Sequence, residues 1–315
     1  MMRLIFGYRG FGLLCFLASF SLMSVCQTGV SFDPKHQKEI TSEFEGYIAK
    51  LKIYESSAKQ NRLQIEISKE QHILNSFALP DEMAQVDEIT FASDKNVIIF
   101  GHLAWAVSGI VIYNIPERLT GDYFWCYKPA LSKDKRFLVY EKFYPQHFTK
   151  GVSSEYLVYD LQKSAQANRP PRIRNSDLEN VGFPIYPPGS NNSFGDNVER
   201  SAAQVHDMRS EGFYWSNDNR KVAFADKFNG VTNLVVVDIS NSADLKVKVE
   251  PLPLDQIVSV KGLPGICEGV HRESWFTVSR IDFDDHDPAK LHLSFAAASP
   301  KCLQEKQLDM FAAGR

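Results

Sequence analysis

The sequence lacks the short motifs that usually mark a catalytic or metal site. It contains no Gly-x-Ser-x-Gly, so the nucleophile elbow of an α/β-hydrolase is missing. It also contains neither His-Glu-x-x-His nor Cys-x-x-Cys, two spacings by which zinc and redox sites are recognised. Because these motifs are missing, the sequence predicts no enzyme class, and we expect no cofactor.

Runs of basic residues are also missing. The 35 Lys and Arg residues are balanced by 38 Asp and Glu residues, which gives a formal net charge of -3. Because nucleic-acid binding needs clustered positive charge, nucleic acid is not an expected partner. Cysteine is scarce too: five residues in a chain of 315 are too few for a disulfide-based scaffold.

The N-terminus predicts export. Arg3 and Arg9 precede an apolar stretch over residues 11–25, an order typical of a secretory signal peptide. The stretch is shorter than the roughly 20 residues that span a bilayer. We expect cleavage after Cys26 and a periplasmic or secreted protein. The alternatives are an uncleaved anchor, a buried helix, or a lipid anchor at Cys26, for which the branched Val25 is a poor preceding residue.

Removal of the signal peptide would leave three cysteines, Cys126, Cys267 and Cys302. An oxidising compartment permits a disulfide bond. We expect Cys267 to pair with Cys302 and Cys126 to remain a buried thiol, while the sequence leaves the other pairings open.

Residues 35–54 follow a helical pattern. Their apolar side chains recur at steps of three and four: Ile40, Phe44, Tyr47, Ile48, Leu51 and Tyr54. We expect an amphipathic helix that packs on its own domain. The alternative is a partner or membrane-surface helix, although its mixture of Lys and Glu argues against an anionic membrane. Residues 61–68 alternate apolar and polar residues, which predicts a half-buried strand.

From residue 86 onward the chain consists of predicted strands and turns, with three self-similar stretches at 89–115, 129–161 and 213–239. Each has a short strand, a turn rich in Ser, Asp, Asn and Lys, a second strand, a loop, and a last strand that ends in Asn or Asp. A repeat of about 40 residues built from short strands is typical of propeller blades.

The third copy carries a family resemblance. Residues 215–225 (WSNDNRKVAFA) and 232–238 (TNLVVVD) resemble the repeat of TolB-like β-propellers. That repeat has an aromatic residue, Ser-Pro-Asp-Gly-Lys/Arg, an apolar strand, a turn, and a strand ending in Asp. Here Asn217 replaces the Pro and Asn219 replaces the Gly. The resemblance implies a mainly β fold, a β-propeller-like assembly of antiparallel sheets. It does not imply one activity, because such blades occur in transport scaffolds, peptidases and lyases.

A fourth, weaker copy is predicted as a hairpin over 274–282 and 291–297. The expected organisation is a signal peptide (1–26), an N-terminal helix and strand segment (27–85), a β-propeller-like domain (86–299) with an insertion (162–212), and a C-terminal tail (300–315).

Aromatic and histidine side chains in two predicted loops are the candidates for binding, since exposed aromatic residues favour interfaces. They are Tyr144, His147, Phe148, Phe183, Tyr186 and His206. The alternative is that the aromatic rings pack against the sheets and that the histidines are ordinary surface residues.

An acidic cluster precedes Pro288. Its carboxylates are weak candidates for a calcium site: Asp282, Asp284 and Asp287, with Asp285 and His286 between them. The EF-hand pattern fails, and polar residues at this position also suit a hairpin turn, which we favour.

These features together predict an exported, non-catalytic β-propeller-like binding or scaffold protein of the cell envelope. Its partner would be another envelope or extracellular protein, or a small ligand. The membrane would be contacted only through the signal or a lipid anchor at Cys26. The alternative is a secreted or periplasmic hydrolase or lyase with a site in the propeller loops.

Overall fold

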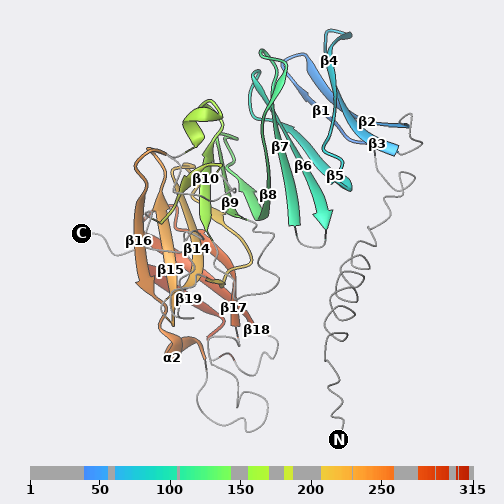
Figure 1. Cartoon of the computed structure of the whole chain (residues 1–315). Helices are drawn as coiled ribbons and strands as arrows, with labels where there is room; N and C mark the ends of the chain where they lie inside the picture. The colour runs from blue at the N-terminus through green and yellow to red at the C-terminus, as the bar shows by residue number, and fades with distance from the viewer. Residues whose placement is uncertain are drawn as a thin grey trace, which may run out of the picture.

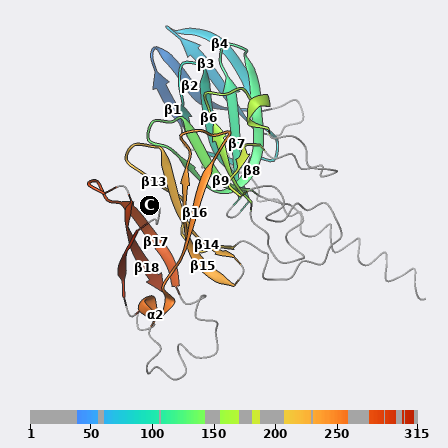
Figure 2. The same cartoon turned by 90° about the vertical axis from the view of Figure 1, so that its left-hand side faces the viewer.

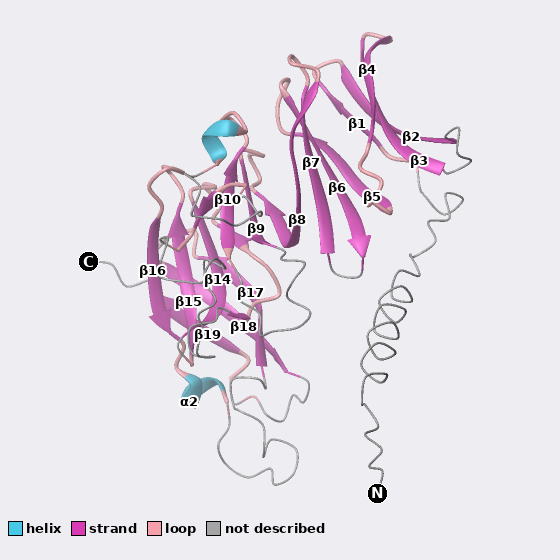
Figure 3. Ribbon diagram, viewed as in Figure 1, coloured by secondary structure: helices cyan, strands magenta, loops and turns pink. Residues whose placement is uncertain are grey.

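The computed structural model describes residues 39–55, 61–104, 107–142, 155–169, 181–186, 207–228, 230–258, 276–287, 289–297, 303 and 305–311. These residues form a mainly β structure of antiparallel sheets (Figure 1). The two helical segments it describes are short: the 3-10 helix η3 (Gln166–Asn168) and α2 (Leu254–Ile257), as Figure 3 shows.

Four sheets are formed in chain order. The first contains β1 (Thr41–Phe44), β2 (Tyr47–Glu55), β3 (Asn61–Lys69) and β4 (His72–Ala78). The second contains β5 (Gln85–Phe91), β6 (Asn96–Ala104), β7 (Val107–Asn114), β8 (Leu119–Leu131), β9 (Phe137–Lys142), β10 (Tyr156–Asp160) and β11 (Phe183–Pro184). The third contains β12 (Asp207–Met208), β13 (Tyr214–Trp215), β14 (Lys221–Phe228), β15 (Val231–Asp238) and β16 (Lys246–Pro251). The last contains β17 (Phe276–Phe283), β18 (Lys290–Ala297) and β19 (Gln307–Phe311).

The second sheet consists of two blade-like units that share β8. The first part of β8, up to Cys126, pairs with β7, and the part from Cys126 onward pairs with β9. A bulge separates the two parts, and Lys128 within it has a φ of 48°. Bulges bend strands and increase their twist. The chain therefore forms five successive units: unit 1 (β1–β4), unit 2 (β5–β8), unit 3 (β8–β11), unit 4 (β12–β16) and unit 5 (β17–β19).

Each of units 2, 3 and 4 buries one face against the unit before it and the other against the unit after it, and the two end units bury one face each. Four apolar clusters fill the four seams. Neighbouring residues on one strand pack in different clusters, on opposite faces of the sheet. Ile99 of β6 packs at the seam between units 1 and 2, whereas Ile98 packs at the seam between units 2 and 3. This follows from the period of two along a strand. It explains why the inner strands are apolar at nearly every position.

The outer faces of the two end units are mostly polar, although Ile73 of unit 1 and Phe311 of unit 5 are exposed on them. On unit 1, Lys50 pairs with Glu39, and Lys52 pairs with Glu66 at 3.3 Å. On unit 5, His292 lies on the face opposite the buried Leu291 and Leu293. The end units lie far apart in both views (Figures 1 and 2). Within the described part of the chain, no buried apolar cluster joins unit 5 to unit 1.

The predicted helix over residues 35–54 is wrong from Thr41 onward, where the chain forms β1 and β2. Glu45 and Gly46 have φ angles of 47° and 80°, so they form a two-residue turn with positive φ at both positions, as a tight hairpin requires. Ala49 and Leu51 then alternate into the core. Apolar residues spaced three and four apart also occur in such a hairpin. Gly46 was the residue that distinguished a hairpin from a helix. The strand predicted over 61–68 is confirmed as β3.

The order of strands and turns predicted for the three stretches forms as β5–β7, β8–β10 and β13–β15, and the fourth hairpin also forms. Two of the copies have the same turn at atomic level: Ser132 donates to Asp134 at 2.6 Å, and Ser216 donates to Asp218 at 2.6 Å. The glycine position of the family repeat has a φ of 58° in both copies, occupied by Lys135 and Asn219. The hairpin predicted over 274–297 forms as β17 and β18.

Equivalent turns of neighbouring units are also bonded to one another. The backbone N–H of Lys133 donates to the Asn219 side chain at 2.9 Å, and the Lys133 ammonium donates to Asn217 at 2.8 Å. Asn217 in turn donates to Asp285 of unit 5. The turns of units 3, 4 and 5 are therefore linked along one end of the array.

We expect Lys135→Gly to raise the free energy of unfolding by about 0.5 kcal/mol. Lysine is strained in this left-handed backbone conformation and glycine is not. The free energy gained by removing that strain exceeds the extra conformational entropy that glycine loses on folding. Asn219→Gly should lower it instead, because asparagine tolerates this conformation and its side chain accepts the Lys133 N–H. Urea denaturation of both variants measures the difference. Equal effects of the two substitutions would contradict this interpretation.

Candidate functional site

The candidate site is a buried carboxylate at the seam between units 3 and 4. Asp226 of β14 is 1% exposed. Its Oδ1 accepts hydrogen bonds from the Tyr156 hydroxyl at 3.0 Å and from the Asp207 backbone N–H at 3.1 Å. Its Oδ2 accepts one from the Tyr186 hydroxyl at 2.9 Å. A buried carboxylate needs such donors, because its desolvation is otherwise very costly.

These contacts fix the two ends of one long segment. Tyr186 is the last described residue before residues 187–206, and Asp207 is the first one after them. Both are bonded to the carboxylate of Asp226. One buried side chain therefore holds the entry and the exit of this segment against unit 4.

The ends of a second segment lie beside the first. Residues 143–154 leave from Lys142 and return at Glu155, next to Tyr156. The Lys142 N–H donates to the Glu155 carbonyl at 2.8 Å, and the Lys142 ammonium lies 3.7 Å from the Glu155 carboxylate. Burial lowers the pKa of Lys142, and the nearby Glu155 opposes that shift. The described ends of both segments thus lie close to Tyr156.

The tyrosines of the site are held in their neutral form. Burial, followed by the charge of Asp226, raises the pKa of both Tyr156 and Tyr186 well above the ordinary tyrosine value. Each hydroxyl is therefore a hydrogen-bond donor at physiological pH. With three donors directed at it, Asp226 is suited to holding structure and poorly placed to accept a proton from a substrate.

A similar arrangement occurs at the seam between units 2 and 3. Asp122 of β8 accepts the Tyr159 hydroxyl at 2.8 Å and also pairs with Arg169. At the seam between units 3 and 4, Asp160 accepts the Ser242 hydroxyl at 2.9 Å. Carboxylate–hydroxyl bonds across seams are thus a recurring device of this fold. What distinguishes Asp226 is that its partners flank a long segment.

Of the six predicted binding residues, the structure brings Tyr186 to this site. Phe183 is half-buried in β11, with the Lys163 ammonium 4.8 Å from its ring centroid. Four others lie outside the described residues: Tyr144, His147, Phe148 and His206. The sequence pointed to the loops but not to Asp226, whose partners lie 19, 40 and 70 residues away along the chain.

The acidic cluster forms a hairpin turn. Asp284 accepts the N–H groups of His286 and Asp287 at 2.8 and 2.9 Å, and Asp287 accepts the N–H of Ala289 at 3.0 Å. Asp282 pairs with Arg280 at 2.7 Å. Among the described residues, no group of three or more ligand side chains is placed to hold a metal ion.

Asp284 also contacts a histidine on the outer face of unit 5. His292 Nε2 lies 3.1 Å from Asp284, and its Nδ1 lies 2.7 Å from Asp309, which also pairs with Lys290 at 2.8 Å. Asp309, then Asp284, raise the pKa of His292 above its usual value. The turn amides hold the pKa of Asp284 at about 2.

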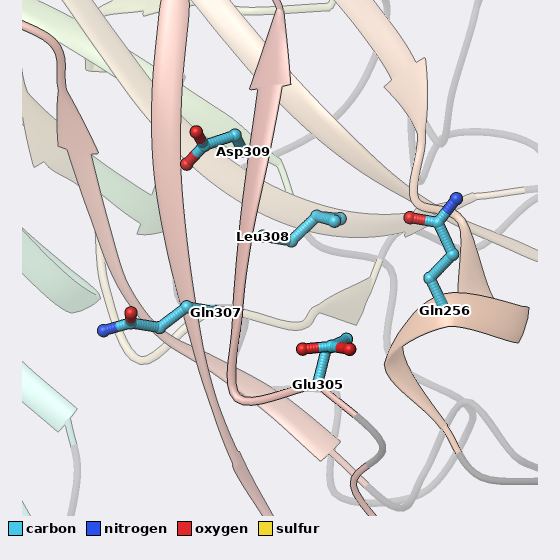
Figure 4. A pocket seen from close by; sticks show the side chains of 5 residues that line it. All are labelled: Gln256, Glu305, Gln307, Leu308 and Asp309. Atoms are coloured by element: carbon cyan, nitrogen blue, oxygen red, sulfur yellow. The ribbon is translucent and has the colours of Figure 1, made fainter.

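A hollow of about 430 Å³ lies beside β19 (Figure 4). It is lined by Gln256, Glu305, Gln307, Leu308 and Asp309. In Figure 4, Leu308 points toward Gln256, whereas Gln307 and Asp309 point the other way. Because Asp309 is already engaged by Lys290 and His292, its carboxylate is not free for a ligand.

Cys126 is a buried thiol, as predicted, and burial raises its pKa strongly. A buried thiol of this kind is unreactive. Cys267 and Cys302, the predicted disulfide pair, and Cys26 lie outside the described residues. Within the described residues, no helix is long and apolar enough to cross a membrane.

No protein-family model and no curated protein sequence matches the chain. Solved structures with a similar arrangement include the β-propeller domain of the trilobed protease from Pyrococcus furiosus, at 9% identity and a TM-score of 0.29, covering 82% of this chain and 78% of that one. They also include a post-proline cleaving enzyme from Rickettsia typhi, at 10% identity and a TM-score of 0.37, covering 82% and 33%.

A structure described as the eukaryotic initiation factor is similar at 8% identity and a TM-score of 0.40, covering 87% of this chain and 55% of that one. The chain thus spans less than two thirds of both this protein and the Rickettsia enzyme. The proteins compared include peptidases and a protein of another kind, and scores this low favour no activity. The propeller-like description rests on the sheets and seams of the chain itself.

We expect Tyr186→Phe to lower the free energy of unfolding by about 1.5–3 kcal/mol, because a hydrogen bond to a buried carboxylate is lost. The matched control is Tyr140→Phe. The Tyr140 hydroxyl is buried and has no hydrogen-bond partner among the described residues, so its removal should be neutral or stabilising. Chemical denaturation measures both variants. A larger loss for Tyr140→Phe than for Tyr186→Phe would contradict the role given to Asp226.

We expect His292 to titrate above the ordinary histidine pKa, and Asp309→Asn to move its pKa back down. Because the pKa of His292 is higher in the folded than in the unfolded state, its contacts stabilise the fold at pH values below the unfolded-state pKa. This stabilisation is lost as the pH rises through the folded-state pKa of His292. NMR titration of the imidazole signals measures the shift. An unchanged His292 pKa in Asp309→Asn would show that the contact does not form in solution.

Proposed function

We propose that the chain is an exported, non-catalytic binding or scaffold protein of the cell envelope, built from TolB-like repeats. Its binding surface would lie where residues 143–154 and 187–206 leave units 3 and 4. The observation that supports the proposal is the double anchoring of residues 187–206 on Asp226, through Tyr186 and the Asp207 N–H.

Such anchoring suits recognition. Binding loops are commonly carried by a rigid scaffold, and side chains locked by packing and hydrogen bonds hold a site in its working geometry. A buried carboxylate costs desolvation free energy that apolar side chains filling the same seam would not, so its contacts with Tyr186 and Asp207 favour a role beyond packing. The side chains proposed to meet the partner are Tyr144, His147, Phe148 and His206, which the two segments carry.

The partner is proposed to be another envelope or extracellular protein, or a small ligand. Tyr and Phe give an interface large contact area, and loops rich in them are typical of binding surfaces. Export is proposed from the N-terminal sequence, with cleavage after Cys26. Lipid attachment at Cys26 is the alternative form of the mature chain.

Site-specific photo-crosslinking in the native host tests this function. A photoreactive residue at position 147 should give one discrete crosslinked species, and the same residue at position 52, on the outer face of unit 1, should not give it. The Tyr144→Ala and Phe148→Ala double variant should reduce the yield of that species several-fold. The mass of the purified mature chain shows whether it begins after Cys26.

Two results would contradict the proposal. One is a mature chain that retains residues 1–26 and is found in the cytoplasm. The other is hydrolytic turnover by the purified chain that His147→Ala or His206→Ala abolishes, which would establish the hydrolase alternative.

A further inference from the structure

A second hollow, of about 270 Å³, lies at the seam between units 1 and 2, whereas Asp226 lies at the seam between units 3 and 4. Strands β2, β3 and β4 contribute to one side, and the turn between β7 and β8 forms the other. The turns next to its lining residues are 45–46, 70–71 and 115–118, and all are described. The first two lie side by side, since the Glu70 N–H donates to the Gly46 carbonyl at 3.3 Å.

The floor of this hollow is apolar. Ile67 is fully buried and Ile115 nearly so, and Leu74 completes the floor. The Tyr47 ring and the flat ring of Pro116 also line the space. A volume just below the range of about 300–1,000 Å³ for drug-sized ligands suits one ring and a short chain.

Two polar groups of the lining are already satisfied within the protein. The Asn75 amide donates to the Tyr113 hydroxyl and to the Arg118 carbonyl, and its oxygen accepts the Ser76 N–H at 2.9 Å. Asn75 therefore ties β4 to the turn that carries Arg118 and fixes the shape of the hollow. It is not itself the group that a ligand would need.

One charged side chain, that of Arg118, lines the hollow. No ion pair or side-chain hydrogen bond engages its guanidinium among the described residues. The Lys69 ammonium lies 4.3 Å from the centroid of the Tyr47 ring. Glutamates 45, 70 and 117 occur on the same turns, yet none of them forms an ion pair with either cation. Apolar side chains beside the unpaired Arg118 guanidinium favour a ligand with one apolar and one anionic end.

We propose that this hollow binds a small carboxylate that carries a single ring. The ring would lie against Tyr47, Leu74 and Pro116, the lining residues with accessible apolar surface. The carboxylate would meet Arg118, whose planar fork suits bidentate contact. This site is independent of the surface proposed on units 3 and 4.

The test is an NMR titration of the mature chain with 3-phenylpropionate and with its neutral analogue 3-phenylpropanamide. The carboxylate should give saturable shifts at the amides of Tyr47, Leu74, Ile115 and Arg118, and the neutral analogue should bind about tenfold more weakly. Absence of saturable shifts at these amides up to roughly 10 mM carboxylate would overturn the proposal.

Three variants separate recognition from folding. Arg118→Gln should remove the preference for the carboxylate over the amide. Arg118→Gly should do the same while keeping the fold, because the φ of 54° at this position suits glycine. Arg62→Gln, which removes an arginine of β3 in unit 1 that pairs with Asp81 at 3.0 Å, should leave the preference unchanged. If Arg118→Gln binds the carboxylate as tightly as the native chain, Arg118 does not recognise it and the proposal fails.

Discussion

The fold depends on the burial of each sheet against the next. The inner strands are apolar on both faces, so a unit such as β9–β10 has no water-compatible face of its own. One antiparallel sheet cannot bury both faces alone, and stacking solves this for every unit except the two at the ends. The mostly polar outer faces of units 1 and 5 match that requirement. The array therefore resembles a short stack of blades with hydrophilic ends.

The apolar faces drive neighbouring units together, but apolar contacts specify the relative position of two units only weakly. Directional bonds across the seams supply the missing specificity: Tyr159 to Asp122, and Tyr156 to Asp226. The linked turns around Lys133 and Asn217 add contacts at one end of the same seams. Buried polar groups of this kind contribute modest net stability and strongly disfavour alternative registers, because a shift would leave a carboxylate without donors. At Asp226 the same device also places the ends of residues 187–206.

The parts of the fold that local pattern determines were predictable. Strand alternation and the Ser-x-Asp turns identified the repeats, and the turn before Pro288 identified the last hairpin. The first hairpin was misread because Tyr47, Leu51 and Tyr54 also fit a helical period, while Gly46 carried the deciding turn signal. The tail from residue 300 gave no strand pattern, although residues 307–311 form β19. Asp226 was not predictable at all, since its role depends on three partners brought together by stacking.

Hydrogen exchange measured on Val235→Ala tests the central claim, that each unit is stabilised by its immediate neighbours. Val235 is fully buried at the seam between units 3 and 4, and loss of its two methyl groups should cost about 2 kcal/mol. Amides of β9, β10, β14 and β15 should lose protection most, while those of β2 and β3 in unit 1 should keep theirs. A uniform loss of protection across all five units would contradict this claim, because it would mean a single cooperative core.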